Sequence, residues 1–365
     1  MLLKLNDIII YMLLSFGLTM IIYPFVINQL RKMKLGVTNR ELASTWEKAV
    51  IFNELHKKKN WTPTMGGIVF LIVMALLVGL SFLLQKLWYI NNTLASRQET
   101  YILLVSFFGV GILGLVDDYV KLKLNTKINW LWATLKLVYM ILFAIFISYR
   151  FNMKLGINII DLWPIDYIRN TGSQSIHIFG QNIQFSFWYI LVTFVLTTAI
   201  INSINITDWL DGLMGGMILI VLVVLGGMSF YLWRYLATTI VGIVVGILLW
   251  YLWFNISPAK IFMWDSWSLA LWGLVSALVY LISIKIWFII PFMILFLVFW
   301  IEITSSGLQI FWKKVFKKKL FLIAPFHHLL EKLWYPEHNI VMRFWLIQWA
   351  LAMLVAIMLI YQVYH

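Results

Sequence analysis

The chain has 365 residues, of which 62% are hydrophobic and only 12% are charged, and its mean hydropathy is +0.90. These values exclude a water-soluble enzyme and a disordered or fibrous chain, because apolar runs long enough to cross a bilayer of about 30 Å recur throughout the sequence. The chain contains no Cys, which excludes disulfides, thiol catalysis, iron–sulfur clusters and thiolate zinc sites. Its formal net charge of +13 suits an anionic partner, and the placement of the charges decides which kind.

Apolar stretches of about 17–25 residues predict about ten membrane-spanning helices in one all-α, polytopic domain that covers residues 1–365. The predicted spans are residues 8–30, 66–85, 101–116, 132–149, 187–203, 213–232, 235–254, 266–284, 286–311 and 341–362. No basic segment precedes the first span and no small-residue cleavage site follows it, so we interpret it as a retained helix. Residues 150–186 differ from the spans, because Pro, Gly and alternating polar and apolar residues predict a small β-hairpin there.

The basic residues fall mainly on one side of this predicted topology. Segments 31–60, 117–136, 255–265 and 313–343 carry 20 of the 28 Lys and Arg residues. By the positive-inside rule these segments are cytoplasmic, and an even number of spans then places both termini and the hairpin outside.

Five aspartates share the predicted cytoplasmic side: Asp117, Asp118, Asp208, Asp211 and Asp265. Carboxylates at membrane level are costly unless they face a polar cavity, a cation or a partner. Any one of the five can be a solvated loop acid, but their convergence predicts a functional site on that face.

Two cytoplasmic segments combine lysine with groups that can bind ions. In KNWTPTMGG (59–67), Lys59 precedes a turn-prone proline and a Gly pair at a helix start, where backbone N–H groups can face an anion, although helix starts commonly look like this. In GLVDDYVKL (114–122), Asp117 and Asp118 are adjacent carboxylates, which suits a divalent cation or a base. Pairing of either acid with Lys121 along a helix is the structural alternative.

The segment NSINITDWLDGLMGG (202–216) repeats a polar residue at every third position. On a helix this spacing would place Asn202, Asn205, Asp208 and Asp211 on one broad face beside a cavity. Such a polar wall can coordinate the waters of a hard cation or bind sugar and phosphate oxygens, and hydrogen bonding between helices is the structural alternative.

The last candidate residues are split between segments 255–273 and 324–337. Asp265 stands at a predicted helix start, and Phe262 nearby could stack on a planar base. His327 and His328 follow a proline in a basic loop and offer imidazoles, although a His pair is more often structural. The His spacing lacks a second pair of zinc ligands, and the acids resemble the oxygen ligands of magnesium.

Six motifs occur in order along the chain: TPTMGG (62–67), DDYVK (117–121), N..N.TD..DGL (202–213), LWFN..PAK.FM.D..SLAL (252–271), APFHH..E (324–331) and RFW (343–345). Together they resemble the phospho-N-acetylmuramoyl-pentapeptide transferases of bacterial cell-wall synthesis, within the polyprenyl-phosphate N-acetylhexosamine-1-phosphate transferase superfamily. The resemblance covers nearly the whole chain. The family commonly has a third consecutive His, where this chain has Leu329, and residues 41–58 are longer than usual for it.

The resemblance implies ten transmembrane helices in the inner membrane, outer termini, a cytoplasmic active-site cleft and a requirement for Mg²⁺. The implied reaction transfers phospho-N-acetylmuramoyl-pentapeptide from UDP-N-acetylmuramoyl-pentapeptide to undecaprenyl phosphate and gives lipid I and UMP. The implied partners are the bilayer and these two substrates, with no nucleic acid, and homodimers are known in the family.

Roles for individual residues follow from the matching motif positions. Asp265 would be the principal Mg²⁺ ligand, and Asp117 or Asp118 would deprotonate or position the lipid phosphate, so that the implied catalytic residues are Asp117, Asp118, Asp265 and His327. The nucleotide pocket would include a ring that stacks on uracil, Phe262. The remaining implied substrate-binding residues are Lys59, Lys121, Lys136, Asn205, Asp208, Asp211 and His328.

Two other functions are compatible with parts of the sequence. A polyprenyl-phosphate N-acetylglucosamine-1-phosphate transferase would share the Asp motifs and differ mainly in the 324–337 loop. A secondary transporter would also place acids in the membrane, but near its midplane in broken helices. The acids here stand at helix ends on one side, which favours an enzyme.

The chain holds 20 Trp and 20 Gly, although Gly alone averages about 7% of residues. The resembled family has Gly where this chain has Trp61, Trp130, Trp209, Trp250, Trp264, Trp267, Trp272 and Trp334. The codons GGA and TGA differ by one base, and some bacterial genetic codes read TGA as Gly. We therefore hypothesise that many of these tryptophans are Gly in the living cell. The alternative is interfacial aromatic anchoring, which suits Trp88 and Trp253.

Overall fold

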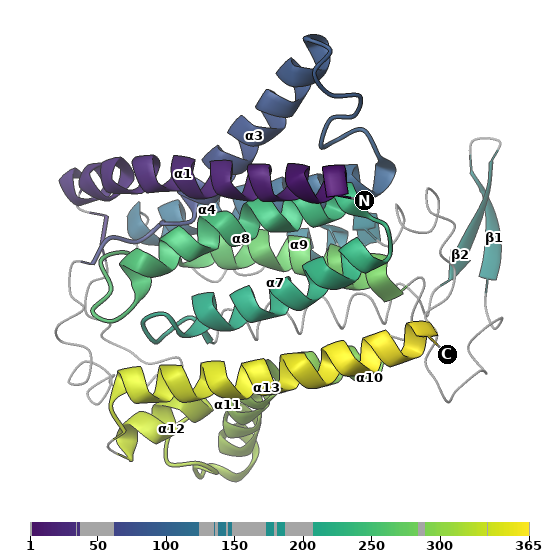
Figure 1. Cartoon of the computed structure of the whole chain (residues 1–365). Helices are drawn as coiled ribbons and strands as arrows, with labels where there is room; N and C mark the ends of the chain where they lie inside the picture. The colour runs from purple at the N-terminus through teal and green to yellow at the C-terminus, as the bar shows by residue number, and fades with distance from the viewer. Residues whose placement is uncertain are drawn as a thin grey trace.

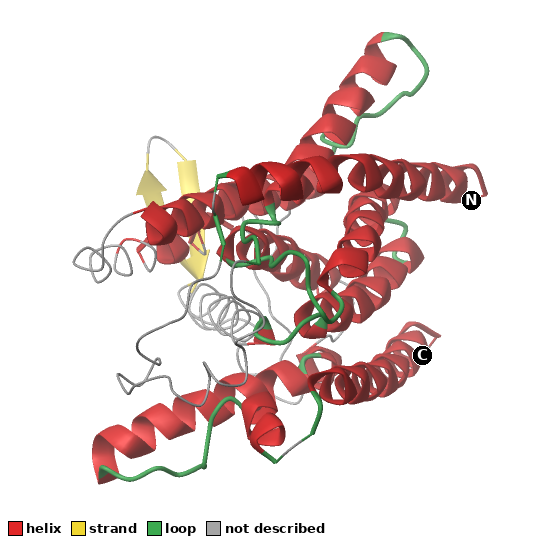
Figure 2. Ribbon diagram, turned by 90° about the vertical axis from the view of Figure 1, so that its left-hand side faces the viewer, coloured by secondary structure: helices red, strands yellow, loops and turns green. Residues whose placement is uncertain are grey.

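The computed structural model describes residues 2–33, 35–36, 62–123, 135, 138–143, 145–147, 173–178, 181–186, 207–283, 289–333 and 335–364. Long helices dominate this part of the chain and pack into one bundle (Figure 1, Figure 2). The protein is therefore a mostly helical membrane protein, as its composition predicts.

Six of the described helices are long and apolar enough to cross a membrane. They are α1 (Leu2–Lys32), α3 (Ile68–Lys86), α4 (Gln98–Lys123), α7 (Leu213–Tyr231), α8 (Tyr235–Asn255) and α13 (Glu337–Tyr364). Each coincides with a predicted span, because an uninterrupted run of about 20 apolar residues in helical form matches the thickness of the hydrocarbon core. A seventh predicted span, 266–284, corresponds to α9 (Asp265–Ser283), whose apolar part, Trp267–Ile282, is shorter.

The predicted span 286–311 is not one continuous helix. It is divided at Phe296 into α10 (Ile289–Leu295) and α11 (Leu297–Phe316). The buried side chain of Gln348 in α13 donates a 2.8 Å hydrogen bond to the carbonyl of Leu295. It takes an acceptor that an unbroken helix would use internally, a recognised cause of helix breaks. Of the other two predicted spans, 132–149 is described only in part and 187–203 lies outside the described residues.

The bundle is built around helices that are apolar on all sides. α9 packs most extensively against α4, and α8 packs between α1 and α7, as Figure 1 shows for the last three. Two glycines allow the closest approaches: a Cβ at Gly273 of α9 would collide with the carbonyl of Ser106 in α4, and one at Gly246 of α8 with the carbonyl of Met12 in α1. Small residues serve this purpose between membrane helices.

Both chain ends lie at the same end of the bundle (Figure 1). A two-stranded antiparallel sheet lies toward that end, formed by β1 (Ser173–Ile178) and β2 (Gln181–Ser186). The register pairs Ser173 with Ser186 and Ile178 with Gln181. The strands fall within the segment for which a hairpin is predicted.

Candidate active site

Three separate parts of the chain carry the five aspartates. Asp117 and Asp118 lie in the last turns of α4, Asp208 and Asp211 lie in the turn before α7, and Asp265 begins α9. The packing of α9 against both α4 and α7 brings these parts together. The backbone N–H of Asp211 donates a 2.7 Å hydrogen bond to the carboxylate of Glu337 at the start of α13. The site therefore lies opposite the end of the bundle that holds the chain termini (Figure 1).

Two backbone N–H groups at the start of α9 hold two of the carboxylates. The N–H of Asp265 donates a 3.1 Å hydrogen bond to Oδ1 of the fully buried Asp118. The N–H of Trp264 is a hydrogen-bond donor to the carboxylate of Asp208. Carboxylates are favourable partners for the N–H groups that a helix start leaves without acceptors. As a result Asp118 and Asp208, from two different segments, are both held at the start of α9, beside Asp265.

The pKa of Asp208 reflects how close the acids are to one another. Part of its surface is exposed, yet the protein atoms around its carboxyl raise the pKa of Asp208 well above the ordinary value of 3.8. The negative charge of Asp265 raises this pKa further, the N–H of Trp264 partly offsets the rise, and the charges of Asp118 and Asp211 add to it. Four carboxylates therefore share a small region, a pattern typical of functional sites.

A second hydrogen-bond network fixes the turn that carries Asp208 and Asp211. Oδ2 of Asp211 accepts a 3.0 Å bond from the N–H of Ala259. The buried side chain of Asn255 accepts a 3.0 Å bond from the N–H of Gly212 and donates a 2.9 Å bond to the carbonyl of Ile261. This network ties the turn to the segment between α8 and α9.

The predicted helical face over residues 202–216 is wrong for residues 208–212, which form turns. Gly212 has a φ of 78°, in the left-handed region, so a regular helix begins only at Leu213. Asp208 and Asp211 nevertheless belong to one site, because the turn and its hydrogen bonds bring them there.

The segment with Phe262 is held by the motif TPTMGG. The N–H of Phe262 donates to the carbonyl of Pro63 at 2.8 Å, and its carbonyl accepts from the N–H of Gly66 at 3.0 Å. The hydroxyl of Tyr23 donates to the carbonyl of Gly66 at 3.1 Å. The prediction that N–H groups of this motif face an anion is therefore wrong at Gly66, whose N–H holds the protein backbone. The Phe262 side chain keeps part of its surface exposed.

The two histidines lie in a short helix, α12 (Phe326–Lys332), beside the aspartate turn. The ring of His328 packs edge-on against Trp209, with the ring centroids 6.2 Å apart, and Nδ1 of His328 is 2.6 Å from Glu331. His327 is fully buried, and its Nδ1 is 2.9 Å from Oε2 of the equally buried Glu302. Sequence reasoning missed Glu302, although a single acid within an apolar span is a signal for a functional residue.

Several predicted residues lie outside the described part of the chain. Lys59, Lys136 and Asn205 are among them, as are Trp61, Trp130 and Trp334. Lys121 lies in the last turn of α4, with its side chain not described. Asn255 and Glu337 are further polar residues of the site that sequence reasoning did not single out.

The acids fit a magnesium ion that is bound together with a substrate. No three His, Asp or Glu side chains among the described residues are grouped closely enough to hold a metal ion by themselves. Mg²⁺, however, usually binds through one or two carboxylates, water and substrate phosphates. The mutual repulsion felt at Asp208 is the condition that a divalent cation relieves.

Comparisons with known proteins identify the family of the chain. A sequence model of glycosyl transferase family 4 matches residues 100–284, which hold all five aspartates. The phospho-N-acetylmuramoyl-pentapeptide-transferase of Geobacillus sp. strain WCH70 is 30% identical over 348 residues, which cover 95% of this chain and 96% of that protein. The enzyme of the same name from Staphylococcus aureus strain bovine RF122/ET3-1 is 33% identical and covers 93% and 95% of the two chains. The one from Clostridioides difficile strain 630 is 30% identical and covers 96% and 98%. The chain therefore belongs to the phospho-N-acetylmuramoyl-pentapeptide-transferases of glycosyl transferase family 4.

Proposed function

We propose that the protein transfers phospho-N-acetylmuramoyl-pentapeptide from its UDP derivative to undecaprenyl phosphate, which forms lipid I and releases UMP. In this reaction an oxygen of the lipid phosphate forms a bond to the phosphorus that carries the sugar, and the bond from that phosphorus to UMP breaks. The observation that carries the proposal is the convergence of Asp118, Asp208, Asp211 and Asp265 from three segments. Phosphoryl transfer depends mainly on positioning and charge neutralisation, which such a cluster with a cation provides.

The resident cation in this proposal is Mg²⁺, held by Asp265 and completed by a neighbouring carboxylate and substrate phosphates. When bound, it neutralises the phosphate charges that develop during transfer. Asp118 supports this arrangement because its Oδ1 holds the N–H at which α9 begins. Asp117, one residue earlier and equally buried, is the candidate that accepts a proton from the lipid phosphate or positions it.

Substrate binding is assigned to the residues around this cluster. The turn with Asp208 and Asp211 shapes the nucleotide pocket, with the partly exposed ring of Phe262 available to stack on uracil. The basic side chains proposed for the phosphates are Lys59, Lys121 and Lys136, together with the imidazoles of His327 and His328. This division suits the donor, which carries two adjacent phosphates.

The proposed setting is the inner membrane, crossed by ten spans, with the aspartates on the cytoplasmic side. The excess of Lys and Arg in the segments on that side supports the orientation. A site at the ends of helices, instead of their middle, suits an acceptor whose phosphate lies at the membrane surface while its chain stays among the lipids.

An assay of the purified protein for UMP release tests the function. UDP-N-acetylmuramoyl-pentapeptide is offered with and without undecaprenyl phosphate and Mg²⁺, beside UDP-N-acetylglucosamine as the competing donor. We expect release only with the pentapeptide donor, the lipid and the ion together. If UMP were released from UDP-N-acetylglucosamine and not from UDP-N-acetylmuramoyl-pentapeptide, the protein would instead be the related N-acetylglucosamine-1-phosphate transferase.

A further inference from the structure

A buried carboxylate and imidazole join α11 to α12. Glu302 lies within α11 and His327 within α12, and neither side chain has exposed surface. Oε2 of Glu302 is 2.9 Å from Nδ1 of His327. The other two polar atoms, Oε1 of Glu302 and Nε2 of His327, are buried and have no hydrogen-bond partner within the part of the chain that the structure describes. A buried polar atom of this kind is normally satisfied by a ligand or by water.

The loop that leads to α12 is fixed by the same helix. Oε1 of Gln309, about two turns beyond Glu302 in α11, accepts hydrogen bonds from the N–H groups of Leu320 and Phe321 at 3.2 and 2.8 Å. Its Nε2 donates to the carbonyl of Phe321 at 3.0 Å. α11 therefore holds both the loop and one ring nitrogen of His327, so the direction of that ring is set before a substrate binds.

We propose that Glu302 is a positioning residue of the transferase. Its carboxylate accepts the Nδ1–H of His327 and leaves Nε2 of the same ring for a phosphate group of the substrate. The proposal rests on the proposed function in taking His327 as a phosphate contact. A carboxylate on one imidazole nitrogen fixes the tautomer and the orientation of the ring, and so sets the direction in which Nε2 points.

The partner of the neighbouring histidine provides a matched control. Glu331 contacts Nδ1 of His328 from within the same short helix, and His328 keeps part of its surface exposed. Glu331→Leu removes an equivalent carboxylate a few residues away without touching Nδ1 of His327. Its effect on the His327 ring should therefore be small.

The first test needs no catalytic activity. In protein with ¹⁵N-labelled histidine, we expect Nδ1 of His327 to be protonated in the wild type and in Glu302→Gln, which keeps an acceptor. We expect that proton to be lost in Glu302→Leu and kept in Glu331→Leu. Protonation of Nδ1 in Glu302→Leu would overturn the proposal whether or not the protein proves to be this transferase.

The second test measures kcat/KM for UMP release in a double-mutant cycle. Glu302→Leu should lower it by about 10- to 100-fold, and Glu302→Gln by less. In a His327→Gln background, either substitution should add almost nothing, because the residue acts through that ring. If the losses in kcat/KM of the two single variants multiply in the double variants, Glu302 only stabilises the fold. That result would overturn the proposal.

A separate observation concerns the backbone at three tryptophans. Among the described residues five that are not glycine have positive φ, and three of these are Trp88 at 64°, Trp233 at 63° and Trp264 at 55°. A side chain with a Cβ rarely adopts this left-handed conformation, whereas glycine adopts it readily.

Two of the three tryptophans occupy a helix-ending position that is usually glycine. After α3, the N–H of Trp88 donates to the carbonyl of Gln85 at 3.0 Å and the next N–H, of Tyr89, donates to Leu84 at 2.9 Å. After α7, Trp233 repeats the pattern, with its N–H bonded to Phe230 at 3.0 Å and the following N–H to Ser229 at 2.9 Å. This is the Schellman motif, in which the left-handed residue is most often Gly.

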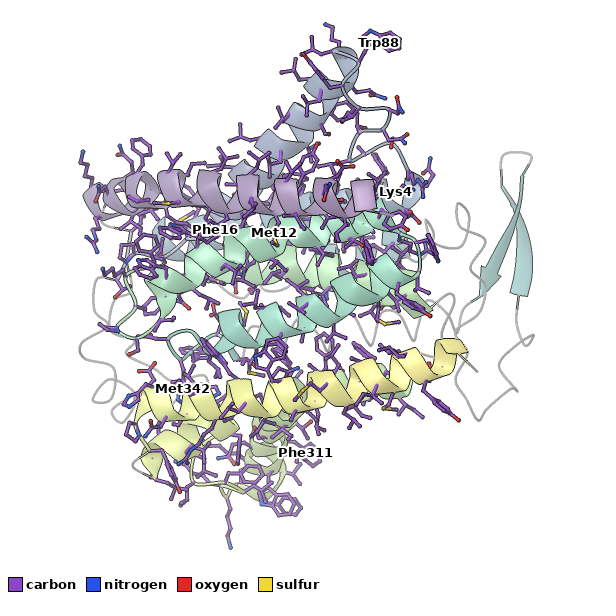
Figure 3. The ribbon with its side chains drawn as sticks, in the orientation of Figure 1. Lys4, Met12, Phe16, Trp88, Phe311 and Met342 are labelled. Atoms are coloured by element: carbon purple, nitrogen blue, oxygen red, sulfur yellow. The ribbon has the colours of Figure 1, made fainter. Side chains whose placement is uncertain are left out.

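The indole rings pack little at the two helix ends, where the ring of Trp233 makes an edge-on contact with Tyr235 at a centroid distance of 5.9 Å. Trp88 is 93% exposed and lies at the outer tip of α3 (Figure 3), and Trp233 is 66% exposed. Trp267, three residues after Trp264, is buried, and its ring centroid is 3.1 Å from that of Phe70. Aromatic pairs normally pack with centroids about 4.5–7 Å apart, so the space does not accommodate both rings.

We infer that positions 88, 233, 264 and 267 are built for glycine, and that their codons are TGA, read as glycine in the cell of origin. For Trp88 this reverses the expectation of an aromatic anchor, because its backbone forms a glycine-type helix end. The inference is independent of the transferase function, since it rests on backbone conformation and ring spacing.

The gene and the purified protein both test this inference. We expect TGA at all four codons, and TGG at Trp253, which lies within α8 and has no left-handed backbone. Trp88→Gly and Trp233→Gly should each raise the melting temperature by about 2–4 °C, whereas Trp253→Gly should lower it. TGG at Trp88, Trp233 and Trp264, or lower melting temperatures in the first two variants, would overturn the inference.

Discussion

Asn255 should matter more for the site than its chemistry alone suggests, because it connects two of the segments that build it. Its side chain is 3% exposed and bonds the N–H of Gly212 at 3.0 Å and the carbonyl of Ile261 at 2.9 Å. Gly212 follows Asp211, and Ile261 precedes Phe262 by one residue. Loss of this side chain should therefore separate the aspartate turn from the segment that leads to Asp265.

The magnitude follows from the two groups that Asn255→Ala leaves without a partner. A buried N–H or carbonyl in that state costs about 1–3 kcal/mol. Two such groups give a loss of about 2–6 kcal/mol in the free energy of unfolding, and water entering the space left by the amide places the loss toward the lower end of that range. Activity should fall further than stability, since a displacement of about 1 Å in a catalytic arrangement can cost about 10²-fold in rate.

The assay compares Asn255→Ala with Gln348→Met. Gln348 is as buried and also holds a backbone carbonyl, that of Leu295 at 2.8 Å, but its contact is with α10 and not with the aspartates. Thermal unfolding in detergent gives the stability of each variant, and UMP release per folded molecule gives its activity. We expect both variants to lose stability and only Asn255→Ala to lose activity, by about 10²-fold. Equal activity in the two variants would refute the idea that the Asn255 network positions the site.

Three further predictions concern the metal, the pH response and the topology. Asp265→Asn should abolish Mg²⁺-dependent UMP release and Asp117→Asn should reduce turnover by about 10² or more without unfolding either protein; full activity in the former would remove the metal assignment. Because folding raises the pKa of Asp208 above 3.8, its contribution to stability is complete below that value and declines as pH rises through the raised pKa. In EDTA the melting temperature of Asp208→Asn should therefore fall less with rising pH than that of the wild type, and parallel curves would contradict this. The chain has no Cys of its own, so a single Cys at Lys318 should react only with a membrane-permeant reagent and one at Arg169 with an impermeant one; the opposite pattern would invert the orientation.

The lengths of the apolar stretches in the sequence predicted the class of protein and most of its described helices. This succeeded because a bilayer requires long apolar helices whatever packs beside them, so the signal is local. The prediction failed at Phe296, where the helix break lies beside a carbonyl that accepts a hydrogen bond from Gln348, about fifty residues away. A contact at that separation leaves no trace in the local pattern of hydropathy.

The sequence by itself also determined which residue types form the site, since Asp265 and the other acids stand out in an apolar chain. Only the tertiary structure decided which of these acids lie close together and which backbone groups they bind. Asp118 holds the first N–H of α9, and Asp208 and Asp211 lie in a turn instead of on the helix that their spacing predicted. Glu302 joins His327 in a buried pair. These relations depend on which helix ends meet in space, and packing between distant parts of the chain sets that, not the spacing of residues along it.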